Sequence, residues 1–171
     1  MTTNGKMQIF RATDSVDLDK SDIMTFAPMS ALQSEGIGKL FEAGYDDGSD
    51  VRVLVDLPGF SLVHLWFKKD FPLPLHSHDT DCLYFIIAGA LQIGTETLGP
   101  RDCFFLPGGS AYTYRPCGPN GVEALEIRHG GKFDLKNLAK NQAFYDAALA
   151  TIQNNVEQWR VSTRPSEAGR P

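Results

Sequence analysis

Short apolar runs alternate with polar turns along most of the chain, and the turns are rich in glycine and proline. The predicted strands lie at about residues 38–43, 51–56, 61–68, 83–87, 91–94, 103–106, 112–115 and 122–128. Turns such as those at 57–59, 99–100 and 107–109 contain the residues that tight turns prefer. Many short strands separated by such turns predict an all-β domain, built as an antiparallel sandwich or barrel.

Beyond the Gly130-Gly131 pair, the periodicity changes from that of strands to that of a helix. Apolar residues recur at helical spacing from Leu135 to about Trp159, with no proline or glycine among them, which predicts a C-terminal α-helix. The beginning of the chain is polar and predicts an arm that lies across the domain or a partner. We therefore divide the chain into an arm over 1–35, a β-barrel over 36–131, a helix over 132–161 and a frayed tail over 162–171.

The composition suits one compact, soluble domain. Of the 171 residues, 42% are hydrophobic and 22% are charged, which allows a substantial core. The net charge is −5 and no basic cluster is present to follow a phosphate backbone, so we expect no nucleic-acid partner. No apolar stretch approaches the about 20 residues of a membrane span, and the N-terminus lacks the order of a signal peptide. Three cysteines without disulfide or zinc-site spacing fit a reducing compartment, so we expect a cytoplasmic protein.

A histidine pair, His76 and His78, precedes the strand predicted at 83–87. In an extended chain, side chains two residues apart point the same way, so the two imidazoles converge on one point. Neutral imidazole nitrogen binds several divalent metals, and we expect one ion here, which is Fe, Zn, Ni or Mn. The alternative is a pair of surface histidines in a loop.

The spacing of these histidines relative to Gly89, Pro107 and Gly109 resembles the two sequence motifs of the cupin family. The resemblance covers roughly residues 51–128. It implies a double-stranded β-helix, the jelly-roll barrel of cupins, which here carries a polar N-terminal arm and a C-terminal α-helix.

The resemblance also implies a metal held by three histidines and a glutamate, and the chain departs from this ligand set. Cys82 stands at the glutamate position and Tyr112 at the third histidine, while Arg101 replaces the opening glycine of the second motif. A thiolate can hold zinc or iron and a phenolate can hold iron, so Cys82 and Tyr112 are candidate ligands. The alternatives are a small apolar core residue at position 82 and a hydrogen-bonding phenol at position 112.

Four further side chains are candidates for the wall of a binding pocket, namely His64, Tyr84, Tyr114 and Glu126. Tyr84 shares a strand face with Cys82, and Tyr114 shares one with Tyr112. His64 supplies a third imidazole if its face is inward, and is otherwise a hydrogen-bonded strand histidine. Glu126 shares a face with Arg128, where the two pair with each other or bind a charged group of a ligand. Glu96 reaches the site only if its hairpin turn folds over the barrel mouth.

Two main functional hypotheses follow, and they belong to different classes. The leading one is a small cupin with one divalent metal, acting on a small organic molecule as a dioxygenase if the metal is iron, or as an isomerase or lyase if it is zinc. The competing one is a non-catalytic cupin that has lost metal ligands and binds or senses a small molecule. A redox sensor built on Cys82, Cys103 and Cys117 is a third possibility.

We also expect a homodimer, because open sheet edges need to be covered. The polar arm is one element that can form the interface. The apolar helix face around Phe144, Leu149, Ile152 and Trp159 is the other.

Overall fold

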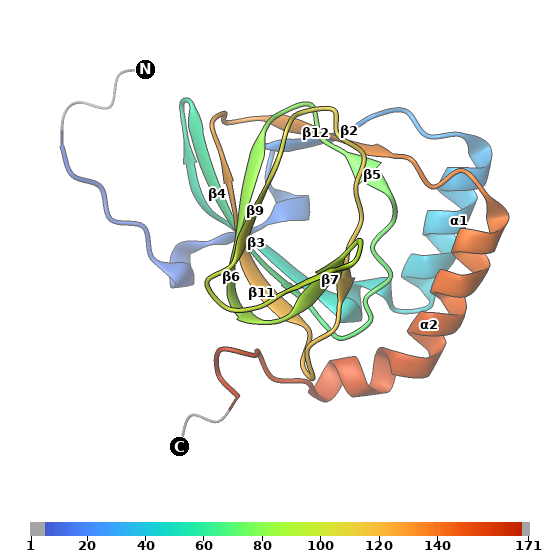
Figure 1. Cartoon of the computed structure of the whole chain (residues 1–171). Helices are drawn as coiled ribbons and strands as arrows, with labels where there is room; N and C mark the ends of the chain where they lie inside the picture. Colours follow the sequence, from blue (N-terminus) through green and yellow to red (C-terminus); the bar gives the residue numbers. More distant parts are fainter. Residues whose placement is uncertain (1–5, 169–171) are drawn as a thin grey trace.

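The main layer of the fold is a six-stranded antiparallel sheet. The computed structural model describes residues 6–168. The strand order in this sheet is β1-β3-β4-β11-β6-β9 (Figure 1). Its strands are β1 (Val16–Asp17), β3 (Ser49–Leu57), β4 (Phe60–Phe67), β6 (Cys82–Gly89), β9 (Cys103–Leu106) and β11 (Val122–Arg128). Because β11 pairs with β4 on one side and β6 on the other, it is enclosed along its length.

Two three-stranded sheets pack against the large one. The first contains β7 (Leu91–Ile93), β8 (Glu96–Leu98) and β10 (Arg115–Pro116), and the second contains β2 (Met24–Phe26), β5 (His76–Ser77) and β12 (Phe133–Asn137). Leu91 shares a buried cluster with Leu65 of β4, and Phe133 shares another with Val63 of the same strand. The predicted sheet-rich domain is therefore confirmed. Over residues 6–168, however, hydrogen bonding divides the strands into three sheets and does not close one continuous barrel.

The turn that ends β6 requires glycine at position 89. Gly89 has φ +76°, and a Cβ atom there would lie 2.1 Å from the carbonyl oxygen of Gly121. Gly121 has φ +85°, and its own Cβ would lie 2.0 Å from the carbonyl oxygen of Phe67. Only glycine tolerates both the backbone conformation and the close approach. The glycine that matches the cupin motif is thus required where the end of β6 meets the turn before β11.

The strand predicted at 38–43 is wrong, because residues 38–42 belong to helix α1 (Ala31–Glu42) and Ala43 is its C-cap. Ser30 caps the helix: its hydroxyl accepts a hydrogen bond from the backbone N–H of Gln33, and the Gln33 side chain accepts one from the Ser30 N–H. This reciprocal pair is a capping box, which is visible in the sequence as Ser-x-x-Gln. The helix also crosses the boundary that the sequence placed at residue 35.

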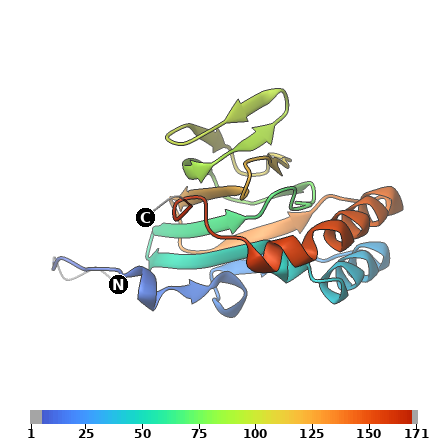
Figure 2. The ribbon, with the colours of Figure 1, turned by 90° about the horizontal axis from the view of Figure 1, so that it is seen from below.

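The predicted C-terminal helix is confirmed as α2 (Gln142–Val161), although it begins later than residue 135. Residues 133–137 form β12 instead, because they pair with β2 and β5. Tyr145, Ile152 and Trp159 of α2 pack into a buried cluster with residues of α1, and Figures 1 and 2 show the two helices side by side. Ile152 and Trp159, which we expected at a dimer interface, are therefore buried within the chain.

The chain ends lie outside the sheets, and they differ in their contacts. The N-terminal segment contains the short 3₁₀ helices η1 (Ala12–Asp14) and η2 (Leu18–Lys20), while η3 (Tyr45–Gly48) follows α1. In the tail that we predicted to be frayed, Arg164 forms an ion pair with Asp50, and the backbone N–H of Ser166 donates to Glu123 at 2.7 Å. The tail is thus attached to the outer face of the large sheet as far as it is described, and residues 169–171 lie outside the described chain.

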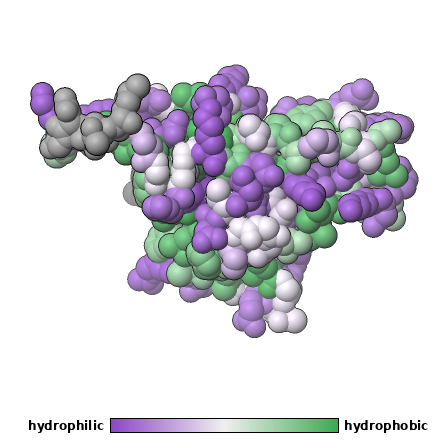
Figure 3. All heavy atoms as spheres, turned by 90° about the horizontal axis from the view of Figure 1, so that it is seen from above, coloured by the Kyte–Doolittle hydropathy of each residue, from purple (hydrophilic) through white to green (hydrophobic). Residues whose placement is uncertain are grey.

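The surface is chemically mixed. On the face seen in Figure 3, hydrophobic residues occur in small groups between hydrophilic ones. Among the described residues, neither helix combines the length and the apolar character needed to cross a membrane.

We predict that Trp159→Ala lowers the free energy of unfolding by about 3–5 kcal/mol, because it leaves a cavity between the helices and the sheets. Trp159 is 1% exposed, and its indole N–H donates to the carbonyl of Lys69 at 2.9 Å. Urea denaturation measures the change. The control is Val161→Ala in the same helix, where the side chain is 73% exposed and we expect a change within about 0.5 kcal/mol. Equal losses in the two variants would contradict this account of the helix packing.

Candidate functional site

The histidine pair lies on a short strand that is held from both sides. In β5, His76 pairs with Asn137 of β12, and Ser77 pairs with Lys136. On its other side, His76 exchanges two backbone hydrogen bonds with Tyr112, at 3.0 and 2.9 Å. These contacts fix the backbone, and the extended geometry then brings the imidazoles of His76 and His78 to a centroid distance of 5.1 Å.

Both imidazoles are anchored through the same ring atom. Nδ1 of His76 lies 2.8 Å from the carbonyl oxygen of Pro74, and Nδ1 of His78 lies 2.6 Å from that of Asp134. A carbonyl oxygen only accepts, so each Nδ1 carries the proton and each Nε2 presents a lone pair. Within residues 6–168, neither Nε2 takes part in a hydrogen bond. Metal-binding histidines are commonly oriented in this way, with one ring nitrogen donating to a backbone carbonyl.

Burial keeps the histidines neutral. His76 is 4% exposed and His78 is 7% exposed. Loss of hydration lowers the pKa of His76 to about 4, and it also lowers the pKa of His78 below its usual value. Both imidazoles are therefore uncharged at neutral pH, which is the form that binds a metal.

A group of three tyrosines lies beside the pair, and Tyr112 is the one next to the histidines. The ring of Tyr112 lies 4.2 Å from that of His76, and its hydroxyl forms a hydrogen bond with the hydroxyl of Tyr84. Tyr84 stacks on Phe104 of β9 at 4.5 Å, and Tyr114 lies 6.1 Å from Tyr84. Burial raises the pKa of all three phenols well above the usual value, so they remain protonated.

Cys82 is buried on the same face of β6 as Tyr84, as the alternation of the strand predicted. Burial raises the pKa of its thiol to about 12. The side chain is thus a neutral thiol at neutral pH and packs among apolar residues.

Strand β11 contributes two charged groups to the same interior. Glu126 is paired with Tyr84 across the sheet, and Arg128 follows two residues later on the same face. Nη1 of Arg128 lies 2.7 Å from Oε2 of Glu126, and both residues are buried. Burial by itself would raise the pKa of Glu126, but Arg128, together with His78 and Tyr84, outweighs this effect and holds the pKa below its usual value. Glu126 is therefore ionised.

We call these residues the interior cluster: His76, His78, Cys82, Tyr84, Tyr112, Tyr114, Glu126 and Arg128. All of them are buried, and Cys82, Tyr84, Glu126 and Arg128 lie on the inward face of the large sheet. No group of three or more His, Cys, Asp or Glu side chains within the described chain is close enough to hold a metal ion. The histidine pair thus has no third ligand of these types already in place.

His64 does not join the interior cluster. It is paired with Leu125 across β4 and β11, on the opposite face of the sheet from Val63 and Glu126. There its Nε2 lies 3.1 Å from Oε1 of Glu123. The alternative of a hydrogen-bonded strand histidine is the one observed, because an inward Val63 requires an outward His64. Glu96 and His129 are exposed at the surface, so neither belongs to the interior cluster.

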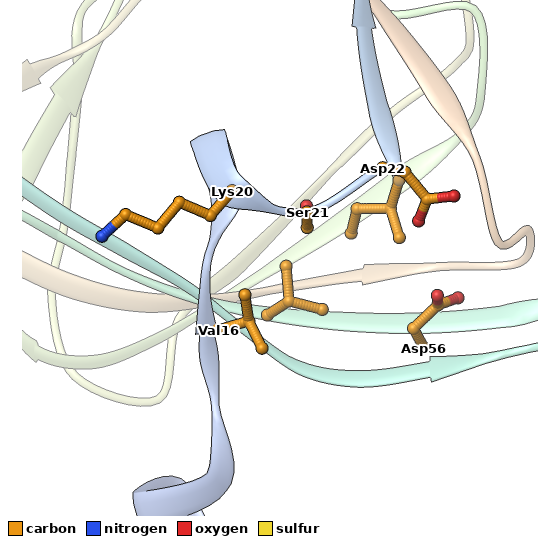
Figure 4. A pocket seen from close by; sticks show the side chains of 7 residues that line it. Val16, Lys20, Ser21, Asp22 and Asp56 are labelled. Carbon is orange, nitrogen blue, oxygen red and sulfur yellow. The ribbon is translucent and has the colours of Figure 1, made fainter.

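Two surface pockets lie away from the histidine pair. One, of about 360 Å³, lies between the N-terminal segment and β3. Figure 4 shows Val16, Lys20 and Asp56 around it. The other, of about 650 Å³, lies between α2 and the loop around Tyr114 and Arg115. Tyr114 is the member of the interior cluster that borders it.

Comparison with known proteins places the fold. No protein-family model matches the chain, and no curated protein matches it either. Among solved structures, the chain resembles the polyketide cyclase RemF from Streptomyces resistomycificus, with a TM-score of 0.52 and 16% identity, over 64% of this chain and 84% of that one. The chain therefore shares the fold of that structure, which agrees with the cupin-type fold that the motif spacing predicted.

Two structures described as cupins align more weakly. One is a cupin-superfamily sugar phosphate isomerase from Silicibacter pomeroyi, with a TM-score of 0.45 and 19% identity, over 50% of this chain and 61% of that one. The other is an RmlC-like cupin from Shewanella frigidimarina, with a TM-score of 0.42 and 17% identity, over 57% of this chain and 82% of that one. Likeness at this level carries no information on substrate.

We predict that Tyr84→Phe and Tyr112→Phe each lower the free energy of unfolding by about 1–2 kcal/mol, since each leaves the other hydroxyl buried without its partner. The double variant should lose less than the sum of the two. Chemical denaturation of all four proteins measures this coupling. Tyr45→Phe is the matched control, because the Tyr45 hydroxyl forms no hydrogen bond within residues 6–168. Strictly additive losses would mean that the two hydroxyls do not interact.

Proposed function

We propose that this chain binds one divalent metal ion through His76 and His78 and acts on a small organic molecule held beside it, within a jelly-roll interior. One observation carries the proposal. Both imidazoles are buried, neutral and anchored through Nδ1, so that two Nε2 lone pairs are available on the same inward face. Two buried histidines that do not bind a metal would have no reason to donate through the same ring nitrogen, Nδ1.

Glu126 is the side chain we propose to complete the ligand set. Its carboxylate is ionised, and it is close enough to both histidines to influence their pKa values. To reach an ion it would exchange part of its contact with Arg128. Cys82 and Tyr112, which the motif comparison suggests, are weaker candidates, since both would first have to lose a proton that burial holds firmly.

A divalent ion held by these residues would supply oxygen chemistry if it is iron and Lewis-acid chemistry if it is zinc. The residues of the chain itself have separate tasks. Tyr84, Tyr112 and Tyr114 exclude water and offer hydroxyl groups as donors to a bound molecule. Glu126 and Arg128 bring a compensated pair of charges to the same space.

The second candidate function is a cupin that binds or senses a small molecule without catalysis. The observation in its favour is that two family ligand positions hold Cys82 and Tyr112, both protonated and packed. Metal content distinguishes the two functions.

We predict that the purified protein contains about one equivalent of Fe, Zn, Ni or Mn per chain, and that His76→Ala and His78→Ala each lose it, because a single remaining imidazole holds such ions weakly. Elemental analysis by mass spectrometry measures the content. His64→Ala and His129→Ala are matched controls, since His64 lies on the opposite sheet face and His129 is exposed, and both should keep the metal. A wild-type protein that is free of metal and cannot be reconstituted would favour the binding function.

We further propose that the chain forms a homodimer through the outer face of the large sheet. Leu83, Phe85 and Phe105 lie together on that face, where Leu83 and Phe105 are cross-strand partners, and they are 37%, 37% and 58% exposed. The arm adds Met7 and Ile9, both exposed, and it extends away from the sheets (Figures 1 and 2). A second copy would cover apolar side chains that water now contacts.

We predict that light scattering gives the mass of a dimer at micromolar concentration, and that Phe105→Glu shifts it to that of a monomer, because a carboxylate cannot be buried unpaired in an apolar interface. Phe41→Glu is the control, since Phe41 is 50% exposed on α1, away from this face. A monomeric wild type would refute the dimer, and a dimeric Phe105→Glu variant would place the interface elsewhere.

A further inference from the structure

Three polar groups buried at one end of the interior have no hydrogen-bond partner within residues 6–168. They are the Arg128 guanidinium, with Nε, Nη1 and Nη2 all lacking a hydrogen bond, the Ser61 hydroxyl and the Thr80 hydroxyl. Arg128 is 1% exposed, so water does not supply the missing partners from the surface. Buried polar groups are nearly always paired, and a concentration of unpaired ones calls for a physical reason.

Two of the three groups are neighbours on the large sheet, and the third lies near the end of the same strand β11. Ser61 and Arg128 are cross-strand partners on β4 and β11, so their side chains share the inward face at neighbouring positions. Thr80 lies two residues before β6 and next to the turn after Arg128, where a Cβ on Gly130 would be 3.9 Å from its methyl group. Thr80 is partly exposed as a residue, so this end of the interior lies close to solvent.

Glu126 cannot satisfy the guanidinium alone. Its Oε2 is 2.7 Å from Nη1 of Arg128, close enough to pair the charges, but the geometry does not form an aligned hydrogen bond. A guanidinium has five N–H donors in one plane, and a single carboxylate oxygen engages few of them. The ring of Phe133 covers one flat face of the guanidinium, at 3.8 Å from its central carbon. The donors at the edge of the plane remain available.

We propose that Arg128, Ser61 and Thr80 bind the carboxylate group of a small organic monoacid. The guanidinium fork matches the two oxygens of a carboxylate, and the two hydroxyls can donate to the remaining lone pairs. A carboxylate suits the site better than a doubly charged phosphate, because Glu126 already offsets the charge of Arg128. The inference rests on the proposed function, which it extends by naming the chemical class of the ligand.

Phe133 connects this subsite to the histidine pair. The same ring that covers Arg128 meets the His78 imidazole edge to face, at a centroid distance of 5.3 Å. A molecule with its carboxylate on Arg128 would therefore place its next atoms beside His78 and Glu126. The acid group would hold the ligand, and the histidine pair would face the part that reacts.

The test compares thermal unfolding in benzoate with unfolding in benzamide, its uncharged counterpart of the same shape, at constant ionic strength and after treatment with EDTA. We expect benzoate to raise Tm with increasing concentration, and benzamide to have no comparable effect. Arg128→Lys keeps the charge but loses the fork, and we expect it to weaken benzoate binding by about tenfold or more. Arg52→Lys is the matched control, because Arg52 on β3 pairs with Asp17 outside the cluster.

Ser61→Ala provides a second variant that does not disturb a charge. It removes an unpaired buried hydroxyl, so we expect the free protein to melt at the same or a higher temperature while the benzoate shift becomes smaller. This comparison remains decisive if the Arg128 variant fails to fold. Equal effects of benzoate and benzamide on the wild type would overturn the proposal, as would a benzoate shift that survives in both variants.

Metal analysis of the same samples before EDTA treatment separates this proposal from the proposed function. If the His76→Ala protein loses metal but keeps the benzoate shift, both proposals are supported. If the wild type holds metal but does not distinguish benzoate from benzamide, the carboxylate subsite is wrong and the metal site stands. If benzoate binds as expected but the wild type holds no metal, the carboxylate subsite is supported and the metal site is not.

Discussion

The pairing of β11 with β4 and β6 is the constraint on which the rest of the interior depends. A strand enclosed on both sides cannot rotate, so its pleat decides which side chains enter the dry space between the sheets. Two of the inward positions carry Glu126 and Arg128. A charge in such a space is costly unless it is paired, and the 2.7 Å contact between these two side chains is what makes their burial tolerable.

The same dry environment explains the protonation states of the other groups. Burial favours the neutral form of each, so it lowers the pKa of the imidazoles and raises that of the thiol and the phenols. The interior thus combines one compensated ion pair with neutral donors and acceptors.

The backbone, more than neighbouring side chains, orients the histidine pair. β5 is only two residues long, yet it is paired with β12 on one side and bridged to Tyr112 on the other, and the ring nitrogens donate to carbonyl groups. Because Tyr112 contributes backbone groups to this bridge, its side chain does not decide how the backbone of His76 is held. On the opposite face of the large sheet, His64 forms a hydrogen bond with Glu123, which also accepts one from the backbone N–H of Ser166 in the C-terminal tail.

Local pattern in the sequence was sufficient for several features. The turn chemistry and strand alternation predicted the sheets, the motif spacing predicted the cupin-type fold, and the His-x-His spacing predicted two convergent imidazoles, because each depends on residues near one another in the chain. Only the tertiary structure decided that residues 38–42 are helical, that His64 faces outward, and that the side chains of Ser61, Thr80 and Arg128 are buried without a hydrogen bond within residues 6–168. The packing of α1 against α2 and the register of β4 against β11 control these outcomes. Register depends on contacts between distant segments, and a shift of one residue would exchange the two faces of a strand.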